Sequence, residues 1–369
     1  MTVSSRSINS VVLGIGTALP KYSISQSQAA EMVQTFSPVG TKDPRLLKAL
    51  YRRTQVTKRG SVLLESPTES YHQSFFEPVS EGNGRGPTTQ TRMERYAKEA
   101  PLLALEASRQ ALDASGLHAR QITHLITVSC TGFLAPGIDA ELIKKLGLLP
   151  SIARTHVGFM GCHGALNGLK LAKAIVDAYP DARVLLCAVE VCSLHFQYGW
   201  DPEKVVANAL FADGAAAAVV RPVSKASTNA WRIGASGSSV FPDSQEAMTW
   251  KIGDHGFEMT LSPRIPDLIA SHLSLWCERW LKENKMKLSD VRSWAIHPGG
   301  PRILGAAAKC LNLSQRMTEA SQEVLAAHGN MSSPTILFIL RNLILKKAPR
   351  PCVALAFGPG LSVEAALFV

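Results

Sequence analysis

The chain has 369 residues, of which 46% are hydrophobic and 18% charged, and its formal net charge is +10. This length suffices for one large domain or two closely packed halves, and the composition is typical of a globular protein with a substantial core. No apolar run is long enough to cross a membrane, and the short apolar stretch after Arg6 predicts a buried strand instead of a secretory signal.

Apolar segments with strand and helix periodicity alternate along the chain. The first half predicts a strand at 11–15, a helix at 101–117, a strand at 125–129, a helix at 164–178 and a strand at 183–189. Residues 65–92 are rich in Gly, Pro, Ser and Thr and predict an irregular excursion. The second half predicts a helix at 265–281, a strand at 293–297, a helix at 332–345 and a strand at 352–357.

The second half repeats the pattern of the first with an offset of 168 residues. The strand that ends at Ser129 maps onto the strand that ends at His297, and Cys162 maps onto Asn330. The repeat predicts an α/β protein of two similar halves packed face to face, residues 1–225 and 226–369. A site on the pseudo-twofold axis would then collect the polar residues Cys162, His297 and Asn330.

The seven cysteines are scattered along the chain, and none belongs to a CxxC pair. A disulfide framework or a zinc site is therefore not expected, and no other spacing of His, Cys and acidic residues suggests a metal. Free thiols favour a reducing, cytoplasmic environment in which most cysteines are inert core residues. The sequence Gly14-Ile15-Gly16 lacks the third glycine of a dinucleotide-binding loop, and no cofactor is expected.

The positive charge has one marked concentration, between residues 42 and 59. It could form an ordinary solvated surface, a site for a small polyanion such as the phosphates of coenzyme A, or a nucleic-acid interface. Tyr51 is the only aromatic residue in this stretch, whereas proteins that bind single-stranded nucleic acid interleave aromatic and basic side chains. We therefore favour the first two readings and expect no nucleic-acid partner.

Cys162 lies in the sequence GFMGCHG, where an apolar strand gives way to a helix beginning near Gly164. The glycines permit a tight turn, and a cysteine at this point faces the positive end of the helix, which stabilises a thiolate. Because a thiolate exchanges acyl groups with thioesters, Cys162 is a candidate acyl-carrying nucleophile. The alternative is a buried structural cysteine.

His297 ends an apolar strand in the sequence AIHPGGP, and Asn330 precedes a helix in HGNMSSP. His297 could pair with the thiolate or donate a hydrogen bond to an oxyanion, with Asn330 as a fixed amide donor beside it. Each also has a structural explanation, as a buried histidine and as a helix cap. Together with Cys162, they favour decarboxylation of a malonyl thioester to an enolate that attacks an acyl group on the cysteine.

These motifs resemble those of bacterial type III polyketide synthases, of the chalcone synthase family within the thiolase-like fold. The resemblance spans nearly the whole chain and rests on GCHGALNGL at Cys162, ALFADGAAA at 209–217, IHPGGP at His297, GNMSSPT at Asn330, and FGPG near the C-terminus. It implies a five-layer αβαβα sandwich and a homodimer without a carrier protein or membrane partner. It also implies repeated condensation of malonyl-CoA onto an acyl-CoA starter, with cyclisation to a pyrone or phenolic product.

The resemblance assigns the catalytic triad to Cys162, His297 and Asn330, and a gatekeeper phenylalanine to Phe211. The serine after the triad asparagine is kept at Ser332. Other cavity positions depart from the plant pattern and leave starter and product open; they carry Phe257, Met259, Trp250, His195, Cys130 and Cys192.

Arg53 best matches the family's coenzyme A phosphate site, with Lys48 and Arg45 nearby. The main alternative is a β-ketoacyl-ACP synthase III, which uses the same triad for one condensation with an acyl carrier protein. The sequence Met331-Ser332-Ser333 argues against that alternative.

Overall fold

The computed structural model describes residues 9–36, 44–65, 72–80, 84–223 and 230–369. A mixed sheet of nine strands runs through them, in the order β11-β12-β13-β8-β1-β7-β6-β4-β5. The first half of the chain supplies β1 (Asn9–Ala18), β4 (His124–Ser129), β5 (Ala153–Gly158), β6 (Val184–Val191) and β7 (Asp213–Val223). The second half supplies β8 (Trp231–Val240), β11 (Ser293–Ile296), β12 (Cys352–Gly358) and β13 (Ser362–Phe368).

The two half-sheets have the same construction on either side of the β1–β8 junction. Reading outward, β1-β7-β6-β4 and β8-β13-β12-β11 each make two antiparallel pairings and then a parallel one. The topology thus repeats, and the offset of 168 residues holds for β4 with β11 and for β6 with β12, but not for β1 with β8 or β7 with β13. In the described part of the chain, β5 has no counterpart in the second half.

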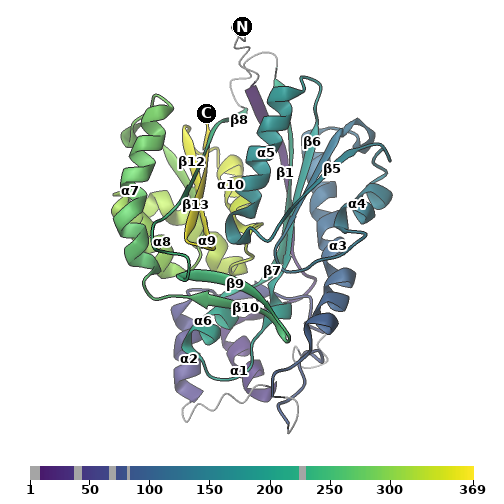
Figure 1. Ribbon diagram of the computed structural model, residues 1–369, viewed down its shortest axis with the longest axis vertical. Helices are drawn as coiled ribbons and strands as arrows, with labels where there is room; N and C mark the ends of the chain where they lie inside the picture. Colours follow the sequence, from purple (N-terminus) through teal and green to yellow (C-terminus); the bar gives the residue numbers. More distant parts are fainter. Residues whose placement is uncertain (1–8, 37–43, 66–71, 81–83, 224–229) are drawn as a thin grey trace.

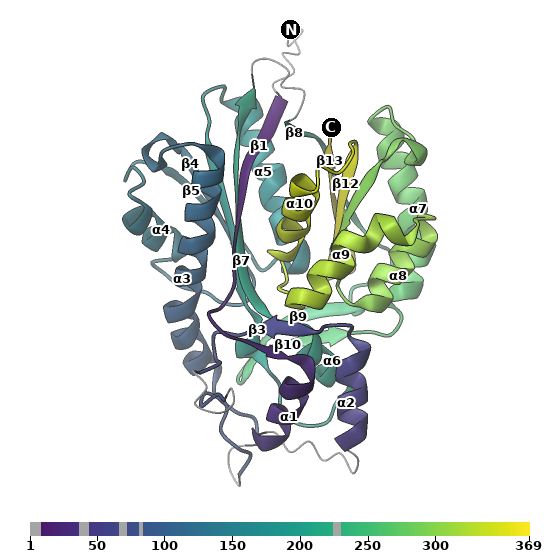
Figure 2. The same ribbon diagram turned by 180° about the vertical axis from the view of Figure 1, so that it is seen from behind.

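Helices form three layers around these half-sheets (Figures 1 and 2). The central layer holds α5 (Gly164–Ala178) and α10 (Thr335–Leu345), one from each half. Helices α3 (Thr89–Ser115) and α4 (Ile138–Leu146) cover the outer face of the first half-sheet. Helices α7 (Ile265–Glu283) and α8 (Pro301–Cys310) cover the outer face of the second, and α9 (Gln315–His328) packs against α10 and β11. The predicted five-layer thiolase-like sandwich is confirmed.

Both faces of each half-sheet are buried, and alternate residues of a strand belong to different hydrophobic cores. Along β6, Leu185 and Cys187 belong to the core beneath α3, whereas Leu186 and Ala188 belong to the core beneath α5 and α10. This alternation follows from the two-residue period of a strand. It explains why the sequence reads as continuous apolar runs in place of an apolar–polar alternation.

The predicted helix at 101–117 is wrong at its start. Helix α3 begins at Thr89, capped by Thr88, and continues through Pro101 to a left-handed Gly116. Proline favours the first turn of a helix and costs about 3 kcal/mol inside one, which is why the sequence predicts a start there. The additional turns bury Arg92 and Tyr96, and this burial outweighs the cost of the proline.

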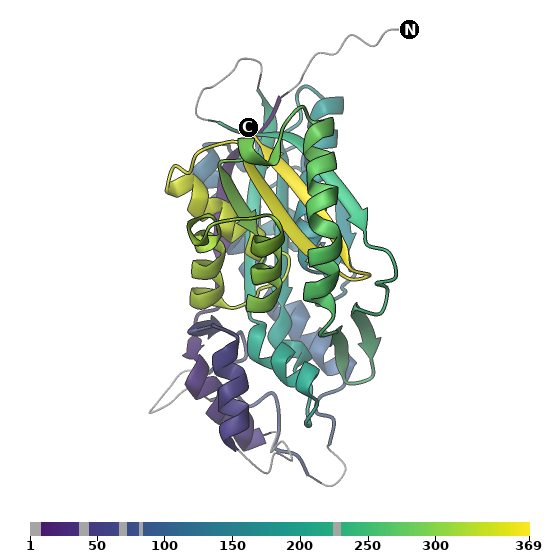
Figure 3. The ribbon, with the colours of Figure 1, turned by 90° about the vertical axis from the view of Figure 1, so that its left-hand side faces the viewer.

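A group of smaller elements that the sequence analysis did not predict lies below the sandwich (Figure 3). It contains α1 (Gln26–Phe36), α2 (Pro44–Arg53), α6 (Pro202–Leu210) and two antiparallel strand pairs, β2 (Ser23–Ser25) with β3 (Lys58–Gly60) and β9 (Met248–Gly253) with β10 (Gly256–Leu261). Among the described helices, none combines the length and apolarity that a bilayer crossing requires.

We predict that Gly16→Ala destabilises the fold, because β1 and α3 touch backbone to backbone at this glycine. A Cβ on Gly16 would lie 2.1 Å from the Ala107 carbonyl oxygen. Such overpacking should lower the free energy of unfolding, measured by urea denaturation, by about 3 kcal/mol. Gly305→Ala in α8 is the control; it meets no atom within 4 Å and should gain about 1 kcal/mol. Equal stability of the two variants would contradict this contact.

Candidate active site

Cys162 lies in a tight elbow between β5 and α5. The elbow is a single 3-10 turn, Gly161–His163, that runs directly into α5. Gly161 has φ +70, and a Cβ there would lie 2.5 Å from Pro359 Cδ in the turn after β12. Only glycine fits this position, both for its backbone angle and for the contact. The predicted elbow is therefore present, with the thiol 7% exposed.

One cavity beneath the elbow collects Cys162 and the predicted gatekeeper and cavity residues, whereas His297 and Asn330 are buried outside its lining. The cavity is lined by Cys162, the predicted gatekeepers and the other predicted cavity residues, namely Phe211, Phe257, Met259, Trp250, His195, Cys130, Cys192 and Ser332. A second arm of the cavity, which the sequence analysis did not predict, reaches α1 and is apolar. Its walls include Met32, Val33, Phe36 and Phe196.

Asn330 is fixed by its backbone and by one side-chain atom. Its N–H donates to the Leu210 carbonyl and its own carbonyl accepts from Ala212 N–H, both at 2.9 Å, so it forms a parallel bridge with Phe211. Its Oδ1 accepts from Ser332 N–H at 2.8 Å. The amide nitrogen Nδ2 is left buried without a hydrogen-bond partner among the described residues. A buried donor of this kind is costly and is a candidate ligand for an anionic oxygen.

His297 is fully buried and extends β11, its N–H donating to the Leu355 carbonyl at 2.8 Å. Neither ring nitrogen has a partner within the described part of the chain. Burial, together with a smaller electrostatic effect of nearby His163, lowers the pKa of His297 to about 3. The resting imidazole is therefore neutral, with one N–H to donate and one nitrogen to accept a proton.

The stabilised thiolate expected at Cys162 is not found in the resting site. Burial raises the pKa of the Cys162 thiol to about 11, and the charge of Glu190 also raises it. The nearby polar groups of Ser332 and Asn330 lower it, but by less. Desolvation thus outweighs the favourable position at a helix start, and the site at rest holds an uncharged thiol.

Glu190 organises the residues around the thiol, and the sequence analysis missed it. It is fully buried in β6, and its carboxylate accepts hydrogen bonds from Thr131 Oγ1 and Ser333 Oγ, each at 2.7 Å, and from the Cys130 N–H. These bonds tie the loop after β4 to the segment after Asn330, where Cys130 Sγ lies 3.5 Å from Ser332 Oγ. A glutamate in the middle of an apolar strand was the signal that could have revealed it.

His195 forms part of a rigid wall and has no free nitrogen for proton transfer. Its Nδ1 accepts from Phe257 N–H at 2.9 Å, so Nε2 carries the proton and donates to the Thr131 carbonyl at 2.7 Å. Burial lowers its pKa to about 3. The ring stacks on Phe257 at 4.2 Å, and Trp250 closes the wall by donating its indole N–H to the Cys130 carbonyl at 2.7 Å.

Arg59 holds the gatekeeper Phe211 and was not among the predicted site residues. Its guanidinium donates to the Phe211 carbonyl at 2.8 Å and to the Asn208 carbonyl, both at the end of α6. A cation there satisfies unpaired carbonyls and suits the negative end of the helix. Since Phe211 also bridges Asn330, Arg59 fixes one wall of the cavity.

The three predicted coenzyme A ligands lie on α2, outside the cavity lining. Arg53 is exposed in the last turn of α2. Lys48 forms an ion pair with Glu31 of α1 at 2.9 Å, and Arg45 is exposed. Metal-binding side chains do not gather in groups of three or more anywhere in the described ranges.

Fold and cavity together define a thiolase-like enzyme with a buried cysteine at the start of a central helix. The family model for the N-terminal domain of chalcone and stilbene synthases matches residues 2–222, and that for the C-terminal domain matches residues 232–369. The chain therefore belongs to the chalcone and stilbene synthase family.

Relatives and solved structures agree with this assignment. The chain is 32% identical to the alpha-pyrone synthesis polyketide synthase-like Pks18 of Mycobacterium tuberculosis, over 97% of this chain and 90% of the relative. It is 32% identical to the 1,3,6,8-tetrahydroxynaphthalene synthase of Streptomyces peucetius, over 96% and 91%. The crystal structure of PKS-I from the brown alga Ectocarpus siliculosus covers 99% of both chains with a TM-score of 0.92 and 29% identity.

These relatives are type III polyketide synthases, and the chain is an acyltransferase of that class. The predicted class of enzyme is confirmed. The comparisons support iterative polyketide synthesis over the single condensation of a β-ketoacyl-ACP synthase III.

We predict that acidification destabilises the protein through its buried neutral histidines. The pKa of His297 falls from 6.5 to about 3 on folding, so the unfolded chain binds more protons between these values. This contribution to stability is complete above pH 6.5 and is lost as the pH falls toward 3. At pH 5 the loss should be about 2 kcal/mol for each such histidine. Urea denaturation at pH 7.5 and pH 5 should show a smaller drop for His297→Gln than for the wild type; an equal drop would contradict a neutral His297.

Proposed function

We propose that the enzyme condenses malonyl-CoA repeatedly onto an acyl-CoA starter held as a thioester on Cys162, and releases a cyclised pyrone or phenolic product. The observation that supports this most is a set of buried, uncharged polar groups, of which the Asn330 amide lies beside the thiol. Both ring nitrogens of His297 and Nδ2 of Asn330 are buried without partners among the described residues. Such groups suit an oxygen that becomes negatively charged only during reaction.

The starter is loaded by acyl exchange. The Cys162 thiol gives its proton to His297 as sulfur attacks the thioester carbonyl, and the tetrahedral intermediate expels the coenzyme A thiolate, which takes up that proton. Attack and proton transfer are coupled, because burial raises the pKa of the free thiol to about 11. The products are an acyl-cysteine, free coenzyme A and a neutral His297.

Extension uses the same donors for a different oxygen. The bond between the malonyl carboxylate and Cα breaks, CO2 leaves, and the electron pair forms an enolate of the acetyl thioester. The enolate oxygen accepts hydrogen bonds from Asn330 Nδ2 and the His297 N–H, each contributing roughly 3–4 kcal/mol by analogy with oxyanion-hole deletions. The enolate carbon then attacks the acyl carbonyl, and the Cys162 thiolate leaves.

The cavity supports substrate entry beside α6 and an apolar acyl chain. We place the coenzyme A phosphates at Arg53, with Arg45 and Lys48 as further candidates, because α2 packs against α6, the helix that ends one residue before Phe211. To bind a phosphate, Lys48 would have to leave its ion pair with Glu31. The apolar arm toward α1 offers space for a starter with an aliphatic or aromatic chain.

We predict that Cys162→Ala abolishes acyl-enzyme formation, because no other cavity thiol stands at the helix start. Intact-protein mass after incubation with an acyl-CoA should show no adduct. Cys187→Ala is the matched control, a buried thiol outside the cavity that should leave the adduct unchanged. Normal starter extension by the Cys162 variant would contradict the proposal.

His297→Gln should separate the two half-reactions. Glutamine can donate a hydrogen bond but cannot take up a proton, so it tests both roles of the imidazole. Starter loading should fall by roughly 10²–10⁴-fold, the usual contribution of a general base. Decarboxylation of malonyl-CoA should fall less, because the glutamine amide still offers a donor to the enolate oxygen. Equal losses in the two assays would argue against this division of roles.

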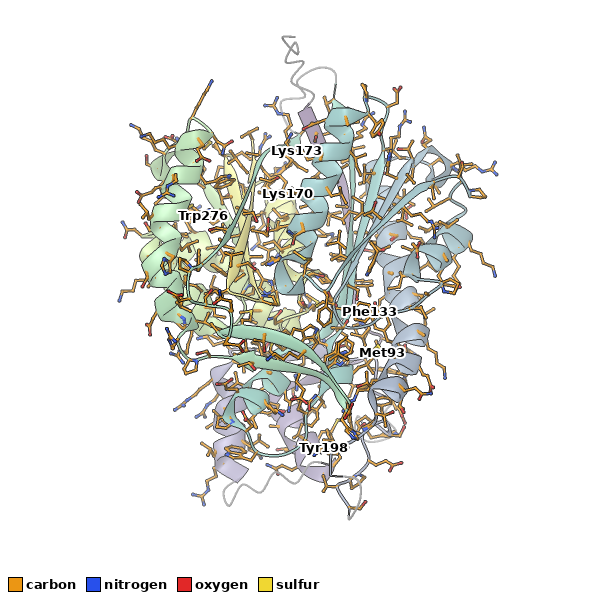
Figure 4. The ribbon with its side chains drawn as sticks, viewed as in Figure 1. Met93, Phe133, Lys170, Lys173, Tyr198 and Trp276 are labelled. Carbon is orange, nitrogen blue, oxygen red and sulfur yellow. The ribbon has the colours of Figure 1, made fainter. Side chains whose placement is uncertain are left out.

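We further propose a homodimer formed at the exposed edge of β5. This strand pairs only with β4 in the described sheet, and it is flanked by Phe133, Leu134 and Met160, which are 46%, 37% and 39% exposed. Phe133 is labelled in Figure 4. An open edge beside an apolar patch is typical of an interface. Phe133→Glu should yield a monomer by light scattering after size exclusion, whereas Leu275→Glu on α7, also exposed, should not.

A further inference from the structure

His163, next to the nucleophile, is buried and takes no part in the chemistry proposed above. It is 2% exposed at the start of α5. Its Nδ1 lies 2.7 Å from Asn167 Oδ1 in the first turn of α5, and its Nε2 lies 2.7 Å from Ser362 Oγ at the start of β13. Both ring nitrogens are thus engaged, one with the helix of the first half and one with a strand of the second.

The hydrogen bond to Ser362 is one of several contacts between the elbow and the turn that joins β12 to β13, residues Gly358–Ser362. The imidazole of His163 packs against Gly358, where an added Cβ would come within 2.3 Å of His163 Cδ2. On the other side of the nucleophile, Gly161 abuts Pro359. The two residues that flank Cys162 therefore both touch this turn.

The turn is itself fastened to the cavity wall. Ser362 Oγ also lies 2.8 Å from the Pro359 carbonyl oxygen, and Pro359 lines the cavity. Gly360 N–H donates to the Met248 carbonyl at 3.0 Å at the start of β9, two residues before Trp250. Through His163 and Ser362, the position of the elbow is linked to the wall opposite the thiol.

We propose that His163 is a positioning residue, whose bridge from Asn167 to Ser362 locks the nucleophile elbow against the Gly358–Ser362 turn and so sets the attack geometry of Cys162. The inference rests on the proposed role of Cys162 in accepting acyl groups. Misplacement of a nucleophile by a fraction of an ångström lowers the rate of attack while leaving substrate binding almost intact. The bridge should therefore act on the maximal rate of acylation and not on the affinity for the acyl-CoA.

The test measures acylation of Cys162 by an acyl-CoA, with rapid quenching and intact-protein mass at several substrate concentrations. We expect Ser362→Ala and His163→Ala each to lower the maximal rate about tenfold, the scale of one buried hydrogen bond, with an unchanged half-saturating concentration. The double variant should be no slower than His163→Ala alone, because both remove one link. His163→Gln, which can reach both partners, should recover most of the rate.

Two further measurements distinguish a loss of acylation rate caused by lost positioning from one caused by general destabilisation of the protein. Ser293→Ala is the matched control; it removes a buried hydroxyl on β11 that donates to the Pro349 carbonyl, away from the turn, and it should leave acylation unchanged. Iodoacetamide should alkylate Cys162 faster in Ser362→Ala and His163→Ala than in the wild type, because a loosened elbow exposes the thiol. Slower acylation with faster alkylation is the signature of lost positioning.

The inference is overturned if Ser362→Ala acylates and alkylates Cys162 at the wild-type rates, or if the two single losses add in the double variant. A wild-type enzyme that forms no acyl-Cys162 would instead refute the proposed function. In that case the alkylation rates alone decide whether His163 holds the elbow.

Discussion

The structure depends on one packing constraint, that each half-sheet is apolar on both faces and the two inner faces share a single helical layer. Helices α5 and α10 must fill the space between the half-sheets, and their residues form one core with strands of both. Because the halves are related by a pseudo-twofold axis, the start of α5 and the segment before α10 meet at one place. That meeting brings Cys162 beside Asn330 and Ser332.

The same burial determines the electrostatics of the site. A thiol, an imidazole and an amide lie where water is excluded, so the ionised forms of the first two are disfavoured at rest. In the proposed reaction, charge forms there only when a substrate brings an oxygen that His297 and Asn330 can bind. Burial raises the pKa of Glu190 as well, and its carboxyl group is held by hydrogen-bond donors from two segments, the loop after β4 and the residues after Asn330. These bonds maintain the shape of the site.

Much of this arrangement could be predicted from the sequence, because its signals are periodic or local. Helix α5 begins and ends where the apolar period predicts, and the repeat correctly paired β4 with β11 and β6 with β12. Pro101 led to the wrong predicted start of α3, because proline favours the first turn of a helix. In the structure it lies inside the helix. The elements below the sandwich were missed because they are short and take their stability from tertiary contacts.

Contacts between distant segments were beyond the reach of the sequence. Nothing near Arg59 indicates that its guanidinium caps α6 and holds the carbonyl of Phe211. The hydrogen bonds that engage both nitrogens of His195 depend on a hairpin some sixty residues further along the chain. Periodicity predicts which faces are buried, but it cannot predict which polar atoms will meet across those faces.

We propose above that one cavity carries out several condensations on coenzyme A thioesters without a carrier protein. The decisive experiment incubates purified enzyme with malonyl-CoA and a panel of acyl-CoA starters and identifies the products by mass spectrometry. We expect products extended by two or more ketide units, released as cyclised compounds. A single 3-ketoacyl product that forms only when acyl carrier protein is added would contradict this proposal.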